Sequence, residues 1–449
     1  MRRLVALFAL LFVAAPAFAA GSVGDHLTVQ RVVSPGGIEA WLVEAKSVPI
    51  VAVEVAFEAG ARFDPAAKPG LAGMMAGLLD EGAGAMDSEA FKAALQDKAI
   101  HMSFGANLDT VQGSLHTLAP YTEDAFKLFA LALSKPRFDK TAVERVRAQI
   151  LVSLAQQESD PDTIASKAWF ADALAGHAYA RPVYGTPASV KTLTRDDIVK
   201  FHAHQIGRDR LKIAVVGPID AKTLARLLDE TFGGLPALGP APPAAPLTVV
   251  TPAKIDIIQR GIPQSVVSFG APGIKVADPD FMPAYVMNYI LGGGGFSSRL
   301  MDELREKRGL TYGISTSLAV LEGGGLLLGG FSTRNESAGD AYRLLLAEVE
   351  RMAKDGVTDK ELEDAKTYLT GSYPLRFDTN EKIASQLLTY RVFGYPIDYI
   401  IRRNDLVRGV TKADVARAAQ RLLKTDRFVF VVVGQPKGLG AAPAAAKTP

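Results

Sequence analysis

The chain has 449 residues, 48% of them hydrophobic and 22% charged, so it can bury sizeable cores in about two to four domains and is too apolar to be mostly disordered. It has no cysteine, which excludes disulfide scaffolds, zinc fingers, iron–sulfur clusters and cysteine nucleophiles. A formal charge of +2 argues against a dedicated nucleic-acid-binding protein, and six histidines leave few candidates for metal ligation.

Residues 1–20 have the pattern of a secretory signal peptide. Arg2 and Arg3 precede an apolar run, residues 4–15, and a segment of small residues with an A-x-A spacing follows it. The run is shorter than the roughly 20 residues that span a bilayer, although an uncleaved anchor is the alternative. We expect cleavage near Ala19, an exported, periplasmic protein without stable membrane insertion, and a mature chain of zero net charge.

The predicted elements do not alternate regularly between strand and helix. The first half contains a strand, a helix, a second strand region and two helices, at residues 51–57, 70–79, 100–118, 123–133 and 140–157. The second half contains a strand, two helices, a strand region and two further helices, at residues 265–269, 280–291, 297–308, 311–332, 338–354 and 359–371. This order favours an α+β fold over a doubly wound sheet.

A proline-rich segment divides the chain. Residues 235–252 contain six prolines, which deny helix and central-strand hydrogen bonds, so we expect an extended linker. It separates a predicted domain at residues 21–234 from a second at residues 253–436. The tail, residues 437–449, is rich in Ala, Gly and Pro and is expected to be disordered.

The two halves repeat the same signals. Thr194 and Thr411 are each followed three positions later by an acidic residue, which predicts a capped helix start. Gly217 and Gly434 each end an apolar strand, and both pairs are separated by 217 positions. A proline before a strand and Asp-Pro after it also repeat, with an offset of 214. We expect one α+β unit written twice; chance recurrence of common caps and strands is the alternative.

Three motifs carry a family resemblance. They are residues 60–65 (Gly-Ala-Arg-Phe-Asp-Pro) with Gly-Leu-Ala at 70–72, the glycine-rich residues 292–300, and residues 304–313 (Leu-Arg-Glu-Lys-Arg-Gly-Leu-Thr-Tyr-Gly). Over about residues 30–435 the chain resembles the insulinase/pitrilysin-type zinc metallopeptidases, in particular the short forms related to the mitochondrial processing peptidase subunits. The resemblance implies two duplicated α+β sandwich domains that face each other as a clamshell.

The residues that hold zinc in active members of that family are missing. There, the helix after Gly-Leu-Ala carries His-x-x-Glu-His, in which two histidines bind zinc and the glutamate is the general base. Here Gly73, Ala76 and Gly77 occupy those positions, residues 152–154 (Val-Ser-Leu) lie near the third ligand position, and the nearest glutamate is Glu158. We therefore expect no metal on this chain and zinc in a partner subunit. The glycines indicate either close packing of another element or relaxation of a vacant site.

The resemblance assigns catalytic roles to Arg305 and Tyr312. They match an Arg and a Tyr, seven residues apart, that in the family reach across the clamshell to bind substrate and stabilise the developing oxyanion. Gly309 suits a helix stop, and the strand after it is expected to place Tyr312 on one face with Ile314, Thr316 and Leu318. The alternative is a solvated arginine and a tyrosine packed on the sheet.

Gly292, Gly293, Gly294 and Gly295 are the candidate substrate-binding residues. In the family, a glycine-rich loop at this place helps to admit or recognise substrate. No Gly-Lys-Ser/Thr follows, so a P-loop is not indicated. The alternative is a flexible turn into the next helix, capped by a serine.

The histidines are weak metal candidates. His202 and His204 are two positions apart and face different directions on a helix. His101 and His116 lie in strand-like segments without partner spacing. Residues 103–110 correspond to an edge that accepts substrate in active relatives, although an ordinary sheet strand is the favoured interpretation.

Two functions follow. The first is the zinc-less subunit of an exported heterodimeric zinc metalloendopeptidase, which donates Arg305 and Tyr312 to the zinc site of a homologous, zinc-carrying partner subunit that cleaves a peptide substrate. The second is a non-enzymatic pseudopeptidase that acts as a scaffold or peptide-binding protein. A metal-free hydrolase with a new site has little support, because no Gly-x-Ser-x-Gly elbow is present.

Overall fold

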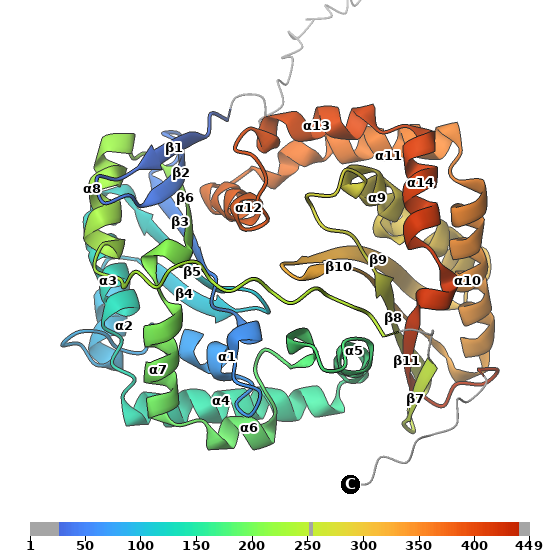
Figure 1. Cartoon of the computed structure of the whole chain (residues 1–449), viewed down its shortest axis with the longest axis horizontal. Coiled ribbons are helices and arrows are strands. Elements are labelled where there is room, and N and C mark those ends of the chain that lie inside the picture. The colour runs from blue at the N-terminus through green and yellow to red at the C-terminus, as the bar shows by residue number, and fades with distance from the viewer. Residues whose placement is uncertain (1–26, 251–254, 440–449) are drawn as a thin grey trace, which may run out of the picture.

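The computed structural model describes residues 27–250 and 255–439 (Figure 1). The predicted signal peptide lies outside the described residues, as does most of the predicted tail. Residues 235–250 carry no helix or strand, and the predicted domain boundaries stay predictions. No helix in the described parts of the chain is long and apolar enough to cross a membrane.

Two mixed sheets form the centres of the two halves. The first contains β1 (Gln30–Val33), β2 (Glu39–Glu44), β3 (Ile50–Phe57), β4 (His101–Ala106), β5 (Val111–Leu118) and β6 (Leu211–Gly217). The second contains β7 (Ile255–Gln259), β8 (Gln264–Pro272), β9 (Thr311–Leu321), β10 (Gly324–Arg334) and β11 (Val429–Gly434). The strand orders are β1-β2-β6-β3-β5-β4 and β7-β11-β8-β10-β9.

The duplication is confirmed by these orders. Apart from β1, each strand of the first sheet has a counterpart in the second, and the β2–β6 and β7–β11 pairs are both parallel. Thr194 and Thr411 each accept a hydrogen bond from the amide three positions on, with a reciprocal aspartate. Gly217 and Gly434 have φ angles of 154° and 145°. A side chain there would collide with the start of β3 or β8, which explains glycine at both strand ends.

Helices pack against both sheets, and all of them except α5 and α12 belong to the half whose sheet they cover. In the first half they are α1 (Leu71–Ala76), α2 (Ser88–Gln96), α3 (Thr122–Ser134), α4 (Lys140–Ser159), α5 (Pro161–Ala173), α6 (Pro187–Thr192), α7 (Arg195–Gln205) and α8 (Ala221–Phe232). In the second they are α9 (Phe281–Asn288), α10 (Ala338–Asp355), α11 (Asp359–Gly371), α12 (Asn380–Val392), α13 (Tyr399–Gly409) and α14 (Lys412–Leu422).

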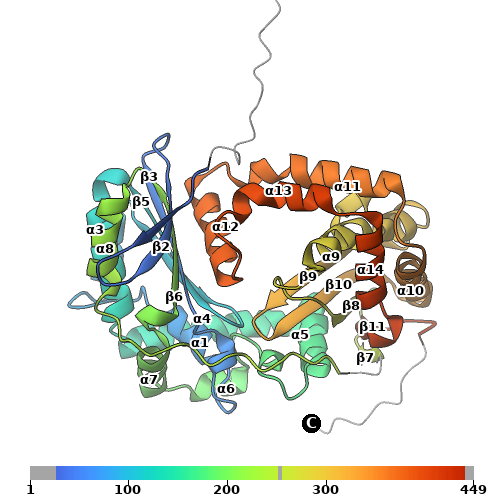
Figure 2. The ribbon, with the colours of Figure 1, turned by 45° about the horizontal axis from the view of Figure 1, so that its top comes forward.

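Each half lends one helix to the other. Helix α12 packs on β3 and β6 of the first sheet, and α5 packs on β8 and β11 of the second (Figures 1 and 2). The Trp169 indole donates a hydrogen bond to the Val429 carbonyl (3.0 Å), and the Asn380 amide donates one to the Ile50 carbonyl (2.7 Å). The inner face of each sheet is therefore buried by the other half, and the two halves form the expected clamshell.

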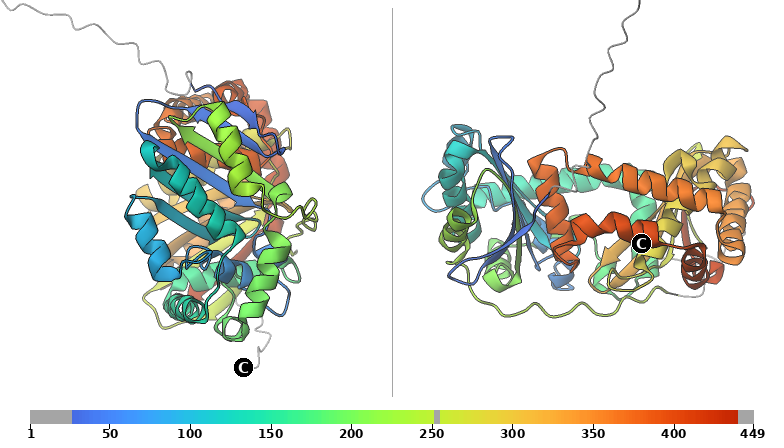
Figure 3. Two further views of the ribbon diagram at one scale, coloured as in Figure 1. Left: turned by 90° about the vertical axis from the view of Figure 1, so that its left-hand side faces the viewer. Right: turned by 90° about the horizontal axis from the view of Figure 1, so that it is seen from above.

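The proline-rich segment runs along the outside of the molecule from one half to the other (Figure 3). It is tied down at its far end, where the Leu247 amide donates to the Gly323 carbonyl (2.9 Å) and the Val250 amide donates to the Ala173 carbonyl (2.8 Å). These bonds join the segment to the β9–β10 turn and to α5.

Three helix predictions need correction. Helix α1 is shorter than residues 70–79. The helix expected at residues 280–291 is α9 followed by a π-helical turn at Tyr289–Gly293, and the one expected at 297–308 contains a π-helix at Met301–Glu306. Four successive glycines give the first turn little helical preference, and π-helical turns gather at functional sites. The stop at Gly309 is confirmed: its φ is +58° and its amide bonds the Arg305 carbonyl at 2.9 Å.

Candidate functional site

Helix α1 is held by a buried carboxylate. Its N-cap, Gly70, has a φ of +98° and no side chain with which to cap the helix. The Asp64 side chain caps the helix instead, because its carboxylate accepts hydrogen bonds from the amides of Gly70 (2.7 Å) and Ala72 (2.8 Å). Burial raises the pKa of Asp64 to about 6. The Asp-Pro and Gly-Leu-Ala motifs thus position α1.

Of the two glycines at the family's ligand positions on α1, one is closed off by packing. A Cβ on Gly73 would lie 2.7 Å from Cδ1 of Tyr184 and 3.0 Å from the Val183 carbonyl, so the ring occupies the space of a side chain. A Cβ on Gly77 would meet nothing nearer than Cγ1 of Val146 at 3.5 Å, an ordinary contact. Close packing therefore explains Gly73 but not Gly77.

No alternative metal centre is evident. Among residues 27–250 and 255–439, no group of three or more His, Asp or Glu side chains is arranged to hold a metal ion. At the third ligand position of the family, Leu154 is buried and Val152 is exposed on α4.

Arg305 lies in the π-helix over an exposed aromatic ring. Its guanidinium carbon is 4.3 Å from the ring centre of Phe296, which is 66% exposed, and its Nε is 3.7 Å from the Glu306 carboxylate. A cation over a ring face is held electrostatically and still presents its edge N–H groups. Arg305 is thus supported from one side and about one-third exposed.

Tyr312 points into solvent. It is 85% exposed and makes no hydrogen bond to a described residue, whereas Ile314 and Thr316 are buried. The prediction of one shared face therefore holds for Ile314, Thr316 and Leu318, which alternate with exposed residues, but it is wrong for Tyr312. The register of β9 and β10 shifts between the pairs that end at Ile314 and Thr311, and such a bulge re-aims side chains. The alternative of a tyrosine packed on the sheet is also wrong.

The four glycines of the loop each have a steric reason. A Cβ on Gly292 would lie 2.5 Å from the Thr316 hydroxyl oxygen, one on Gly293 would lie 2.7 Å from the Asn288 amide nitrogen, and one on Gly294 would lie 2.8 Å from the Tyr289 carbonyl. Gly295 has a φ of +56°. Packing and backbone conformation thus account for the loop, and substrate binding by it stays a prediction.

The first sheet carries a polar cluster that the sequence did not predict. The Ser114 hydroxyl donates to the Glu54 carboxylate (2.7 Å), and Nε2 of His116 lies 3.0 Å from that hydroxyl and 3.2 Å from that carboxylate. His101 stands directly opposite His116. The hairpin turn between β4 and β5 fixes this pairing, so counting outward from it would have revealed it. Both partners meet the same nitrogen, so this is not a Ser-His-acid relay.

The structure also bears on the predictions for residues 103–110 and for His202 and His204. β4 is the edge strand of the first sheet, so residues 103–106 form both a sheet strand and an edge. His202 contacts the Leu133 carbonyl (2.8 Å) and His204 the Lys200 carbonyl (2.6 Å), which confirms that they face different directions.

Asp109 joins the two halves of the molecule. One oxygen accepts a hydrogen bond from the Tyr179 hydroxyl (2.5 Å) and lies 3.3 Å from Nε of Arg62. The other accepts from the Glu322 amide (3.0 Å) in the β9–β10 turn of the second half. Burial, followed by the bond to Asp109, raises the pKa of Tyr179, so its hydroxyl stays protonated.

Known proteins resemble the chain along most of its length. Residues 41–187 match the family Insulinase (Peptidase family M16), and residues 192–369 match the Peptidase M16 inactive domain. A Helicobacter pylori protein named Non-peptidase homolog YmxG is 29% identical over 394 residues, which cover 87% of this chain and 90% of that one. An uncharacterized zinc protease of Mycobacterium tuberculosis, Rv2782c, is 26% identical over 424 residues, 91% of this chain and 93% of the other.

Solved structures agree with the fold. An M16 inactive domain from Pseudomonas fluorescens superposes with a TM-score of 0.85 at 29% identity, over 92% of this chain and 98% of that one. A protease from Helicobacter pylori has a TM-score of 0.83 at 18% identity, over 91% of this chain and 99% of the other, which bears on the fold alone.

Proposed function

The chain belongs to the insulinase family of M16 peptidases, and from that premise we propose that it is the zinc-less subunit of an exported heterodimeric metalloendopeptidase. Its partner is a homologous subunit that carries the zinc and the glutamate base. This chain contributes Arg305, Tyr312 and half of the chamber wall. The N-terminal pattern of residues 1–20 supports export.

One contrast carries the proposal. One position that would hold zinc, Gly73, is filled by packing, whereas Tyr312 is 85% exposed and follows a chain segment that carries the partly exposed Arg305 and the exposed Phe296. Large aromatic side chains and arginines dominate binding energy at protein interfaces. A tyrosine with no internal role, in a chain without the family's metal residues, is suited to act on another subunit.

The chemistry of this pair is electrostatic. The guanidinium of Arg305 and the hydroxyl of Tyr312 both donate hydrogen bonds and can stabilise a peptide carbonyl oxygen as it gains negative charge. In the partner, the zinc supplies an activated water. The loss of one such donor typically raises the barrier by ~2.7–4 kcal/mol.

Co-expression with a neighbouring, zinc-motif-containing homologue tests the proposal. We expect zinc only in the partner, little peptidase activity from either purified chain, and strong activity from the complex. Equal cleavage by the partner alone and by the complex would contradict the heterodimer.

A second candidate is a non-enzymatic scaffold or peptide-binding pseudopeptidase. The Helicobacter pylori relative bears the name of a non-peptidase homolog, and the glycine loop is explained by packing. This function predicts stable assembly, no proteolysis with any partner and full tolerance of Tyr312→Phe.

A further inference from the structure

A cavity lies between the edge of the second sheet and helices α12 and α13. Its volume is about 370 Å³, within the ~300–1,000 Å³ range of small-ligand sites. Residues of strand β9, helix α9, the glycine loop and the segment from Tyr373 to Arg403 line it. None of the side chains that line it is acidic.

Two buried polar atoms in this wall lack partners. Asn288 is 8% exposed and Thr316 is 5% exposed, and neither the Asn288 Oδ1 nor the Thr316 Oγ1 has a hydrogen-bond partner among the described residues. Buried polar atoms are otherwise nearly always paired. Gly292 and Gly293 leave the room in which these side chains sit. The glycine loop thereby accommodates two polar groups that await a ligand.

The opposite wall carries a positive charge without a counter-charge. Arg403 is 3% exposed, and no carboxylate in the described parts of the chain lies within ion-pair distance. Its guanidinium donates to the Leu369 carbonyl (2.6 Å), the Asn404 Oδ1 (3.0 Å) and the Tyr285 hydroxyl (3.1 Å). It also lies 4.6 Å from the ring centre of Tyr373. Arg376 adds a second, exposed cation to the lining. A buried cation with only neutral partners favours an anionic ligand.

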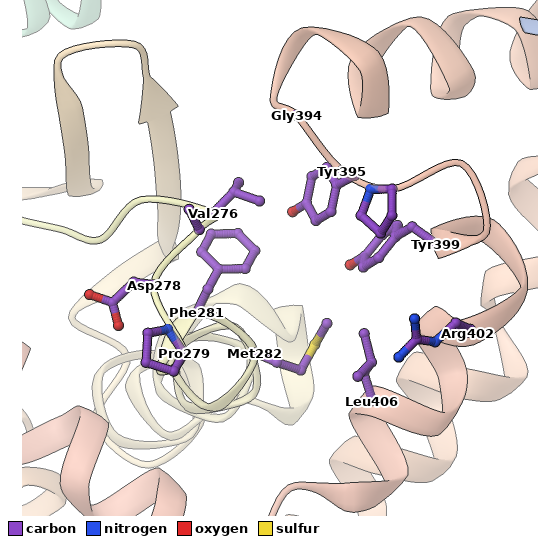
Figure 4. Close-up of a pocket in the computed structure, with 12 residues that line it drawn as sticks. Val276, Asp278, Pro279, Phe281, Met282, Gly394, Tyr395, Tyr399, Arg402 and Leu406 are labelled. Carbon is purple, nitrogen blue, oxygen red and sulfur yellow. The ribbon is translucent and has the colours of Figure 1, made fainter.

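Aromatic rings form the third side. Ring centres of Tyr395 and Tyr399 are 4.1 Å apart, and those of Tyr390 and Tyr399 are 4.9 Å apart. Tyr395 and Tyr399 also line a second cavity, of about 310 Å³. In Figure 4 the two tyrosines lie on one side of it and Phe281 on the other. Burial raises the pKa of Tyr395 to about 12, so its hydroxyl remains neutral.

We propose that this cavity binds the carboxyl-terminal end of a peptide. The free carboxylate meets Arg403 and Arg376, backbone N–H groups donate to the Asn288 Oδ1 and the Thr316 Oγ1, and a large apolar side chain packs against the tyrosines. A free ammonium group would find two cations and no acid there, which selects against a peptide N-terminus. The inference rests on the proposed function in one respect only, namely that the ligand is a peptide.

Titration calorimetry of the purified chain, without a partner, tests the site. The probe is N-acetyl-Ala-Phe with a free carboxylate, compared with the same dipeptide as its C-terminal amide. We expect the acid to bind at least tenfold more tightly than the amide. Thr316→Val and Arg376→Gln should each weaken the acid at least fivefold, and neither removes a hydrogen bond between described residues.

Arg402→Gln is the matched control. Arg402 precedes Arg403, lines the second cavity and pairs with Asp398 at 3.2 Å, so its loss should leave binding of the acid unchanged. Equal affinity for acid and amide, no binding of either, or wild-type binding by both test variants would overturn the proposal. Because this experiment uses the chain without a partner, its outcome is independent of the peptidase proposal. Either proposal can fail while the other holds.

Discussion

Helix α1 and the segment from α9 to the start of β9 follow equivalent strands of the two repeats, β3 and β8. In the first half, all of α1 is buried and the Tyr184 ring closes the space over Gly73. In the second half, Tyr312 is exposed to solvent, and the Asn288 Oδ1 and Thr316 Oγ1 in the cavity wall have no hydrogen-bond partner among the described residues. The first repeat is thus closely packed at this place, whereas the second has an exposed tyrosine and two buried, unpaired polar atoms.

Loss of the Asp109 carboxylate, which makes one of several contacts between the two halves, should give the largest effect on stability. Asp109→Ala leaves the Arg62 guanidinium, whose side chain is only 8% exposed, without its carboxylate. We expect the free energy of unfolding to fall by ~3–5 kcal/mol. Urea titration measures it, with Asp340→Ala as control. Asp340 pairs with Arg343 at the surface, both about two-thirds exposed, so this change should cost ~0–1 kcal/mol. A similar loss of stability in the two variants would show that Asp109 does not help to hold the two halves together.

The packed state of α1 is tested by two matched substitutions. Gly73→Ala forces Tyr184 and the Val183 carbonyl to move, which should cost ~1–3 kcal/mol. Gly77→Ala meets only an ordinary contact and lowers the entropy of the unfolded chain, so its effect should be neutral or stabilising by up to ~1 kcal/mol. Denaturant unfolding of both variants decides. If Gly73→Ala is tolerated as well as Gly77→Ala, the site is open rather than packed.

Two buried threonines of the second half, one with a hydrogen-bonded hydroxyl and one without, should differ by a smaller amount in their effect on stability. The Thr333 hydroxyl donates to the Leu310 carbonyl at 2.5 Å, so Thr333→Val should cost ~1 kcal/mol. Thr316→Val removes a hydroxyl that has no partner among the described residues and should leave stability unchanged or slightly higher. Thermal unfolding compares them. A clear loss of stability for Thr316→Val would mean that its hydroxyl is already satisfied.

The smallest effect concerns two carboxylates that cap helices in the different halves. Burial raises the pKa of Asp64 to about 6, so its contribution to stability declines as the pH rises from about 4 to about 6. Burial also disfavours ionised Glu361, but bonds from Arg299 and Thr358 lower its pKa to about 2, so its contribution is complete above about pH 4.5 and is lost towards pH 2.

Asp64→Asn and Glu361→Gln should change the pH dependence of unfolding in opposite directions. The comparison is made by urea titration across pH 2–7. If the free energy of unfolding of the two variants changed with pH in the same way, the opposite pKa shifts of Asp64 and Glu361 would be contradicted.

Local signals were sufficient to predict much of the fold. Thr194 and Thr411 mark helix starts, and Gly217 and Gly434 mark strand ends, because a capping hydroxyl or a missing Cβ acts within a few residues. The offset between these signals revealed the duplication before any contact was known.

The site depended on contacts that no local signal encodes. The packing of Tyr184 on Gly73 joins residues more than a hundred positions apart. The exposure of Tyr312 arises from a one-residue shift between β9 and β10, which strand periodicity does not show. The pairing of His101 with His116 was within reach, because the turn between β4 and β5 fixes it.

The most direct test of the central claim is the peptidase turnover of the complex with Arg305 or Tyr312 changed. We expect Arg305→Ala and Tyr312→Phe to lower kcat by about 100-fold without loss of assembly or zinc. Arg308→Ala is the control, since Arg308 is exposed nearby and pairs with Glu303 (2.5 Å). Unchanged turnover in both test variants would contradict the account and favour a scaffold.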